Sequence, residues 1–419
     1  MSGAIATPEH TFRESVSLLT TRRFGTFWFA SLLSNIGTWA QQVAQPWLLL
    51  SLGASSVLVG LDSFAMSAPV WVLTLAGGVL ADRADRRRVI CGFQSVQMLC
   101  PILIVALLLA GTIQPWIIIT LSLVVGITDA LSMPSFSSIV PSIVEHEQIG
   151  TGLALNSTQF NLSRIAGPAL AGILMASVGA IGCFVVSAVS YLPFIGVALF
   201  ILPRGRTARS ASDPFDPRHP YVGIRDIIRT PRLRGALLTA FFSGLLCGPV
   251  VTFCPVLVRS AFNGDAAQFS ITVGAFGVGG LLGATGLLAV DANRDRRDLG
   301  SWFATAFGLA VVAVAVVPWF WCLVGLLVLA GISMSVTNTS TNTVLQSSAS
   351  SQLRGQAVSL YMLAMRGGGA LGSLATGFSV TVFGIREALL VNGLLAILVQ
   401  TLISRHWRID PAQSVHPSE

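Results

Sequence analysis

Long apolar runs dominate this chain and restrict the folds that are open to it. Hydrophobic residues make up 53% of the 419 residues, charged residues only 10%, and the mean hydropathy is +0.75. The runs approach about 20 residues, the length at which a helix crosses the hydrocarbon core of a bilayer. A soluble core needs neither so many nor such long runs. The sequence therefore predicts an all-α membrane protein.

One polar segment divides the apolar runs into two groups of six. From 203 to Arg234 the chain holds five prolines and eight arginines. We expect a linker here that is part disordered and part interfacial helix, over Tyr221–Arg229. The predicted order is a cytoplasmic segment 1–23, a six-helix half 24–202, a cytoplasmic linker 203–233, a second six-helix half 234–404 and a cytoplasmic tail 405–419.

The distribution of arginine predicts the orientation. All 25 basic residues are arginines; with the amino terminus inside, 21 fall in inner loops and tails and two, Arg259 and Arg386, in outer loops. Arginine excess marks cytoplasmic loops. We expect a multi-pass protein of the inner (plasma) membrane with both termini cytoplasmic. The formal net charge of +7 then reflects retention at the inner face, so no nucleic-acid partner is expected.

A hydrophilic hinge lies between the second and third runs. Residues 82–88 contain four arginines and two aspartates, while the flanking segments carry almost no charge. The hinge resembles the signature loop of the major facilitator superfamily. The matching residues are Gly78, Leu80, Asp82, Arg83, Arg86 and Arg87, with Asp85 in place of the usual glycine. With an aspartate at position 85, the loop resembles that of the branch that contains enterobactin exporters, macrolide exporters and transmembrane secretion effectors.

The resemblance covers residues 20–405 and implies the major facilitator fold, with twelve transmembrane helices in two pseudo-symmetric six-helix halves. The chain repeats itself accordingly. A shift of 209 residues lays Asp82 on Asp291, and a shift of 205 lays Gly179 on Gly384. Two halves in the same orientation produce such a parallel repeat.

The resemblance also implies a gating latch on the cytoplasmic side. Its candidate residues are Gly78, Asp82, Arg83, Arg86 and Asp129. Arg86 or Arg83 would pair with Asp129 and hold that side shut, with Arg164 as the rival partner of Asp129.

Polar residues within apolar spans are the candidates for a substrate cavity, because each intramembrane charge costs about 2.5–3.5 kcal/mol and needs a reason. In the first span they recur every three to four residues, either to pack on neighbouring helices or to line a wet cavity. Arg164 and Arg366 fall on equivalent faces of repeated helices, so both either pair with carboxylates or face the cavity. The candidates are Asn35, Thr38, Gln42, Gln45, Asn156, Gln159, Arg164, Asn338 and Arg366.

Asp62 is the candidate for proton coupling. It lies inside its span, where partial desolvation disfavours the ionised carboxylate. The alternative is an interfacial aspartate that is hydrogen-bonded to helix ends or water. The resembled branch commonly has glutamine here, so the carboxylate is a departure.

Nothing in the sequence supports an enzyme, a cofactor or a metal site. The spacing Gly367-x-Gly369-x-x-Gly372 matches a dinucleotide fingerprint formally, but it follows no strand. Close helix packing explains these glycines better. The absence of lysine excludes the phosphate-binding lysine of an ATP-driven pump.

The sequence thus predicts a secondary active transporter, with proton-coupled efflux of an amphiphilic small molecule such as a siderophore, an antibiotic or another metabolite. Its partners would be the small-molecule substrate, protons and the lipid bilayer, and it would work as a monomer. An importer of a similar solute, a lipid flippase and a non-transporting membrane scaffold are the alternatives. The polar residues in the spans argue against the scaffold.

The predicted topology can be tested by thiol labelling of intact cells. A cysteine introduced in the linker 203–233 should resist an impermeant reagent, whereas a cysteine near Asn263 should react, each compared with the parent chain. Labelling of the linker from outside would contradict the predicted orientation.

Overall fold

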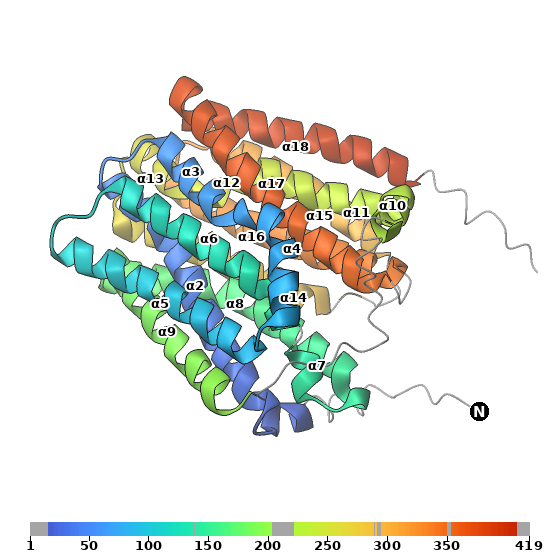
Figure 1. The fold of residues 1–419 in the computed structure, drawn as a ribbon. Coiled ribbons are helices and arrows are strands. Elements are labelled where there is room, and N and C mark those ends of the chain that lie inside the picture. Colours follow the sequence, from blue (N-terminus) through green and yellow to red (C-terminus); the bar gives the residue numbers. More distant parts are fainter. Residues whose placement is uncertain are drawn as a thin grey trace, which may run out of the picture. The chain divides into compact units, whose positions relative to one another are not determined.

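A computed structural model describes residues 16–137, 139–202, 222–288, 290, 295–349 and 353–408. Every regular element in these ranges is helical (Figure 1). The first part of the chain forms α2 (Phe24–Ser51), α3 (Ser56–Ser67), α4 (Pro69–Arg83), α5 (Arg86–Leu109), α6 (Pro115–Ser137), α7 (Val140–Ile143), a 3-10 turn (His146–Gln148), α8 (Ile149–Ser177) and α9 (Ala180–Phe200). The second part forms α10 (Val222–Arg229), α11 (Pro231–Phe242), a π-helical turn (Ser243–Cys247), α12 (Pro249–Thr252), α13 (Cys254–Ala261), α14 (Ala266–Leu288), α15 (Arg296–Val316), α16 (Phe320–Ser348), α17 (Arg354–Phe383) and α18 (Ile385–Arg408).

Within the described residues, nine segments are long and apolar enough to cross a membrane. The helices α2, α8 and α17 are not among the nine, although they are long, with 28, 29 and 30 residues. These three helices carry most of the polar residues that the sequence marks as cavity candidates. Because these residues lower the mean hydropathy, each of the three helices needs protein or water on one side.

Two predicted spans are interrupted by proline. The second breaks between α3 and α4, where Pro69 begins the new helix. The seventh begins at Pro231, before the predicted 235, and contains a π-helical turn in which the Gly248 N–H donates to the Ser243 carbonyl at 3.0 Å. Proline has no N–H for the regular ladder, and such turns absorb the register change.

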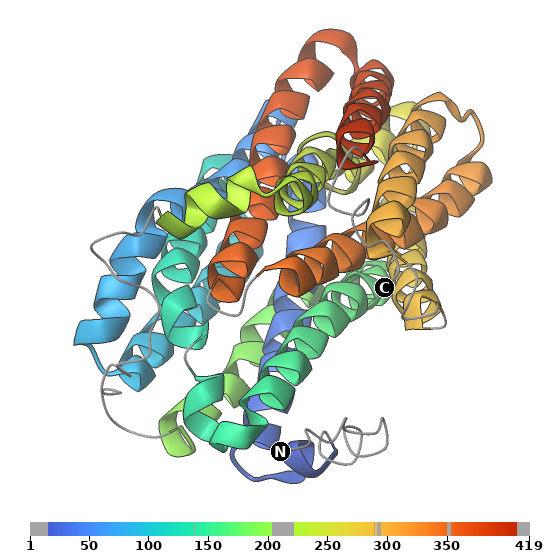
Figure 2. The same ribbon diagram turned by 90° about the vertical axis from the view of Figure 1, so that its right-hand side faces the viewer.

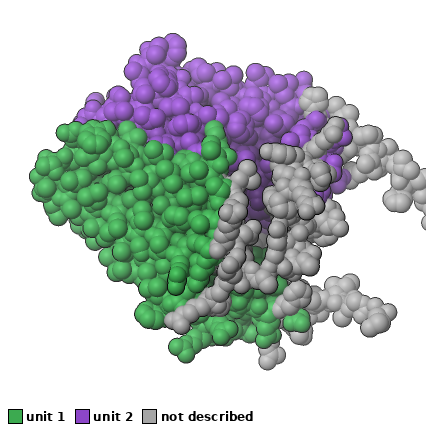
Figure 3. Space-filling view, in the orientation of Figure 1, with its two compact units in different colours: residues 1–48, 69–210 green, residues 49–68, 211–419 purple. Residues whose placement is uncertain are grey.

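The chain forms two compact units, each described here by itself (Figure 3). The first unit comprises residues 1–48 and 69–210, and the second comprises 49–68 and 211–419. The predicted six-helix halves differ in that they assign residues 49–68 to the N-terminal half.

In the first unit, α5 packs on α6 and α9, and α4 packs on α6. A Cβ at Gly77 of α4 would lie only 2.9 Å from the carbonyl oxygens of Ala130 and Leu131 in α6. Glycine therefore allows the backbone of α4, just before the signature loop, to touch α6 directly.

In the second unit, α16 packs on α14 and α15, and α18 lies beside α15 (Figure 2). The glycine-rich stretch of α17 packs on α11 and on the π-helical turn. A Cβ at Gly368 or Gly372 would lie 2.1 or 2.0 Å from the carbonyl oxygen of Phe241 or Leu245. Close packing is thus the role of this stretch, as predicted, but through Gly368 and Gly372; Gly369 has open space beside it.

Backbone landmarks reveal the internal repeat. Gly53 and Asn263 have positive φ angles of 79° and 51°, and Asp85 and Asp295 cap α5 and α15 by accepting from the backbone N–H two residues on, at 3.0 and 2.9 Å. Both pairs are 210 residues apart, so the predicted shift of 209 is wrong by one residue at the helix cap. Gly179 and Gly384, with φ of 77° and 97°, are 205 residues apart, as predicted.

The Asp295 carboxylate also accepts hydrogen bonds from the Arg297 guanidinium, which lowers the pKa of Asp295 below its usual range. The cap of α15 is therefore ionised at neutral pH, where it complements the positive end of the helix.

The two arginines of the predicted outer loops both cap helix ends. Arg259 Nη1 donates to the Leu50 carbonyl at 2.7 Å, and Arg386 Nη1 donates to the carbonyls of Ala315 and Val317 at 3.3 and 2.9 Å. The Arg386 guanidinium also lies 5.3 Å from the ring centroid of Phe262. Cations near the last turn satisfy free carbonyls and complement the helix dipole.

We predict that Arg386→Gln lowers the free energy of unfolding by about 2 kcal/mol, because a half-buried charge-assisted contact to the end of α15 is lost. Thermal unfolding in detergent measures the effect. The control is Arg229→Gln, which removes an exposed arginine of α10. Equal unfolding temperatures for the two variants would contradict the capping role.

Candidate functional site

The polar stripe of α2 packs largely on neighbouring helices of the first unit. The Thr38 hydroxyl lies 3.0 Å from Tyr191 Oη in α9, and Gln45 Nε2 donates to Ser122 Oγ in α6 at 2.7 Å. Ser187 Oγ of α9 donates to Gln41 Oε1, also at 2.7 Å. These contacts agree with the packing alternative for Thr38 and Gln45, whose place in a cavity stays a prediction. Asn35 and Gln42 are half-buried on the same helix.

A second polar connection joins α5 to α6, and the sequence interpretation missed it. Gln94 Nε2 donates to Gln97 Oε1 at 3.2 Å, and Gln97 Nε2 donates to Thr128 Oγ1 at 3.2 Å. Both glutamines are buried. Their spacing of three residues on an apolar helix was the available signal, because amides in hydrocarbon need partners.

Arg164 of α8 lies over the indole ring of Trp39 in α2, with 5.6 Å from the guanidinium carbon to the ring centroid. The Trp39 ring also meets Phe160 edge to face, with centroids 6.2 Å apart. A Cβ at Gly167 would lie 2.3 Å from the Trp39 Cβ, so glycine is needed for this approach of α8 to α2. A half-buried cation held against an aromatic face is stabilised by about 0.5–2 kcal/mol.

Gln159 and Asn156 lie on α8, one to two turns before Arg164. Gln159 is 2% exposed, and its Nε2 atom has no hydrogen-bond partner among the described residues. Asn156 is half-buried. A buried amide without a partner is costly, and a ligand or an ordered water would relieve that cost.

The polar run of α16 lies in the second unit and is packed against protein. Thr337 and Ser340 are 1% and 0% exposed, and a Cβ at Gly300 of α15 would lie 3.3 Å from the Ser340 Cβ. Half-buried Asn338 offers its carbonyl to Tyr361 Oη of α17 at 2.9 Å. Arg366 follows Tyr361 on α17 and is also half-buried. The structure therefore brings α16 and α17 together at Asn338.

Asp62 lies on α3 in the second unit and is only 5% exposed. The helix is held close to α17 by glycines: a Cβ at Gly60 would lie 2.5 Å from the Ser373 carbonyl oxygen, and a Cβ at Gly377 would lie 2.8 Å from that of Ser56. Proton coupling by Asp62 stays a prediction, and an interfacial aspartate hydrogen-bonded to helix ends or water stays its alternative.

For the gating latch, the side chains of Asp82, Arg83 and Arg86 lie outside the described part of the structure, and the roles of these residues and of Gly78 stay predictions. Asp129 is half-buried on α6. It precedes Ala130 and Leu131, whose carbonyls face Gly77 of α4, so the C-terminal part of α4 and the aspartate occupy neighbouring parts of one helix contact.

The family model described as transmembrane secretion effector matches residues 14–419. The chain belongs to this family of the major facilitator superfamily. The match confirms the family resemblance that the sequence predicted over residues 20–405 and extends it to 14–419.

Relatives of this secretion-effector protein are named as transporters. It is 25% identical to the staphyloferrin A transporter of Staphylococcus aureus, over 93% of this chain and 98% of the relative. It is 24% identical to the multidrug efflux pump Tap of Mycolicibacterium fortuitum (89% and 95% covered) and 22% identical to macrolide efflux protein A of Streptococcus pyogenes (90% and 94% covered).

Solved structures support the fold. The nucleoside transporter NupG superposes with a TM-score of 0.72 at 11% identity, covering 93% of this chain and all of that chain. A bacterial homologue of the human lysosomal transporter spinster gives 0.68 at 15% identity, covering 96% and 98%. The secretion-effector protein is therefore a multi-pass membrane transporter of small molecules, and its family is one of transporters, not enzymes.

We predict that Gly167→Ala forces α8 away from Trp39, lowers the free energy of unfolding by about 1–3 kcal/mol and changes the fluorescence of the protein. Gly150→Ala on the same helix is the matched control, because a Cβ there meets nothing within 4 Å. Thermal unfolding and emission spectra measure both effects. The same spectrum and unfolding temperature in the two variants would show that α8 and α2 do not need this glycine.

Proposed function

We propose that this transporter exports an amphiphilic small molecule, such as a siderophore, an antibiotic or another metabolite, in exchange for protons. It does so with twelve transmembrane helices in two six-helix halves and with both termini in the cytoplasm. The efflux pumps and the staphyloferrin A transporter among its relatives support export. The observation that carries the proposal is the placement of titratable and cationic side chains inside otherwise apolar helices.

Asp62 is the proposed proton carrier. At 5% exposure its carboxylate lies away from bulk water within an apolar helix. An ionisable side chain in such a place is a candidate for carrying a proton. Each proton that moves inward gains about 2.3 kcal/mol per 100 mV, enough to concentrate a neutral solute roughly fifty-fold.

Arg164 and Arg366 are the proposed contacts for an acidic or aromatic part of the substrate. The Trp39 ring supports the Arg164 guanidinium from one side, and Gln159 adds an amide with an unused donor nearby on α8. Asn35, Gln42 and Asn156 are half-buried and would complete the cavity on α2 and α8. Within the second unit, Asn338 of α16 and Arg366 of α17 are the proposed cavity residues.

The latch of Asp82, Arg83 and Arg86 with Asp129 remains part of the proposal. The glycine contact between α4 and α6 supports it, because it fixes the end of α4 beside the helix that carries Asp129.

The test begins by deleting the gene and comparing metabolites inside and outside the cell, which identifies the exported compound. Uptake of that compound into everted membrane vesicles then measures transport. Asp62→Asn should abolish accumulation driven by a pH gradient and leave downhill exchange nearly intact. Asp226→Asn is the control, since it removes an exposed acid of α10. Accumulation that persists in Asp62→Asn would exclude Asp62 as the coupling group.

The same vesicles test the remaining roles. Arg164→Gln or Arg366→Gln should weaken transport of acidic substrates more than of neutral analogues, and equal losses would make both arginines structural. Asp129→Asn should insert normally yet transport slowly, whereas an unchanged rate would remove the latch from the mechanism.

A further inference from the structure

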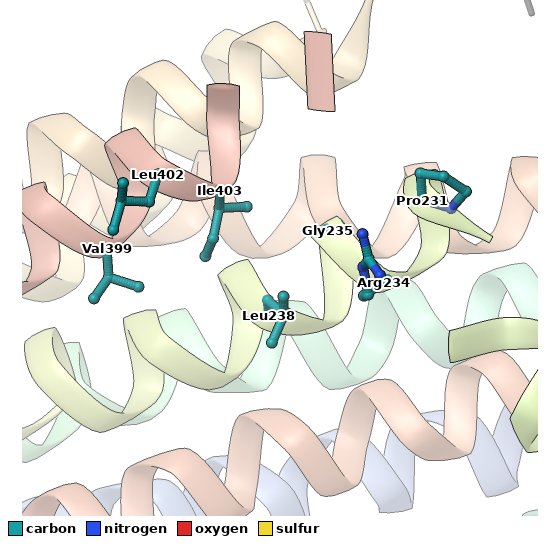
Figure 4. A pocket seen from close by; sticks show the side chains of 7 residues that line it. All are labelled: Pro231, Arg234, Gly235, Leu238, Val399, Leu402 and Ile403. Atoms are coloured by element: carbon teal, nitrogen blue, oxygen red, sulfur yellow. The ribbon is translucent and has the colours of Figure 1, made fainter. Parts of the chain in front are cut away.

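An open groove of about 390 Å³ lies between α11 and α18 (Figure 4). Leu238, Val399, Leu402 and Ile403 line it with aliphatic side chains, and Arg234 is the charged residue among its lining. Leu238 and Leu402 are 37% and 49% exposed. The groove therefore complements the two chemical parts of a phospholipid: its aliphatic lining suits an acyl chain, and the arginine suits a phosphate.

Helical spacing places these residues on one face of each helix. Arg234 and Leu238 are four residues apart on α11, and Val399 and Leu402 are three apart on α18, with Arg405 three residues further. Arg405 therefore continues the α18 stripe toward the end at which Arg234 stands on α11. Both arginines are exposed, and neither forms an ion pair or hydrogen bond with any described residue.

The surrounding charge is positive. Arg229 of α10 is exposed just before α11, and no acidic residue lines the groove. The acids on the neighbouring helices are exposed Asp226 of α10, Asp295, which is bonded to Arg297, and exposed Asp298 in the first turn of α15, so arginines outnumber unpaired acids around the groove. The linker segment 203–221 carries four arginines and two aspartates, so its net positive charge does not complement the arginines beside the groove.

We propose that the groove binds an anionic phospholipid of the inner leaflet, with its phosphate at Arg234 and Arg405 and one acyl chain along Leu238, Val399 and Leu402. The site uses the predicted orientation, in which the ends of α11 and α18 meet the cytoplasmic face. Basic residues at such a position attract anionic headgroups, and arginine binds phosphate through several N–H groups at once. The lipid is a resident ligand of the transporter and not its cargo.

The experiment measures binding to the full chain in detergent by native mass spectrometry, with dioleoyl phosphatidylglycerol as the probe and dioleoyl phosphatidylcholine as the neutral comparison. We expect phosphatidylglycerol to bind preferentially and to raise the unfolding temperature. Arg234→Gln should weaken its binding about tenfold, as expected for the loss of one charge-assisted contact. Arg22→Gln, which removes an exposed arginine of the first unit, should leave binding unchanged.

Further outcomes decide between occupants. Equal binding of both lipids, or equal loss in both arginine variants, would overturn the site. Full stabilisation by inorganic phosphate alone would make it a site for a soluble anion. A photoreactive acyl chain on phosphatidylglycerol should label residues near Leu402. A photoreactive leucine introduced at position 402 tests whether residues 409–419 occupy the groove instead. Crosslinks from position 402 to those residues would also contradict the proposal. None of these measurements depends on transport.

Discussion

Hydrocarbon offers no hydrogen bonds, and this constraint governs every polar side chain of the structure. The first unit meets it by pairing polar groups across helices: α2 with α6 and α9, and α5 with α6. Such bonds are worth about 0.6–2 kcal/mol each in a membrane. They hold the helices in register because each partner has few alternatives. Gln159 differs, because its Nε2 atom has no hydrogen-bond partner among the described residues, and a ligand or an ordered water would satisfy it.

The arginines are divided among three tasks by position. In the predicted outer loops Arg259 and Arg386 donate to carbonyls at the ends of other helices. Their hydrogen bonds explain why these two arginines lie apart from the predicted cytoplasmic loops. Within α8, Arg164 rests on an aromatic ring. At the ends of α11 and α18, Arg234 and Arg405 stay exposed. A count of arginines predicts the loops but cannot distinguish a cap from a ligand, because the distinction depends on which carbonyl or ring lies within reach.

Much of the fold follows from the sequence because hydropathy and repeated glycines act over whole helices. The family, the helical class, helix α10 and the 205-residue repeat were predictable from such patterns. The breaks at Pro69 and in the seventh predicted span were not, since proline is also tolerated inside α5, α6 and α8. The candidate site was predictable only as a set of polar residues. That Thr38 bonds to Tyr191 while Arg164 meets Trp39 depends on side chains more than a hundred residues apart.

The change of the repeat offset from 210 to 205 has a consequence for the surrounding lipid. The two offsets differ by five residues. Three of them are absent from α15, which has 21 residues where α5 has 24, and two are absent from the loop that follows α15. At 1.5 Å per residue, α15 is shorter than α5 by about 4.5 Å. Arg386 and the exposed Trp319 and Trp321 gather at this end, 72% of each tryptophan being accessible. By its length, α15 matches a thinner hydrocarbon layer than α5 does, so we expect the bilayer to thin locally beside α15, a hydrophobic mismatch built into one copy of the repeat.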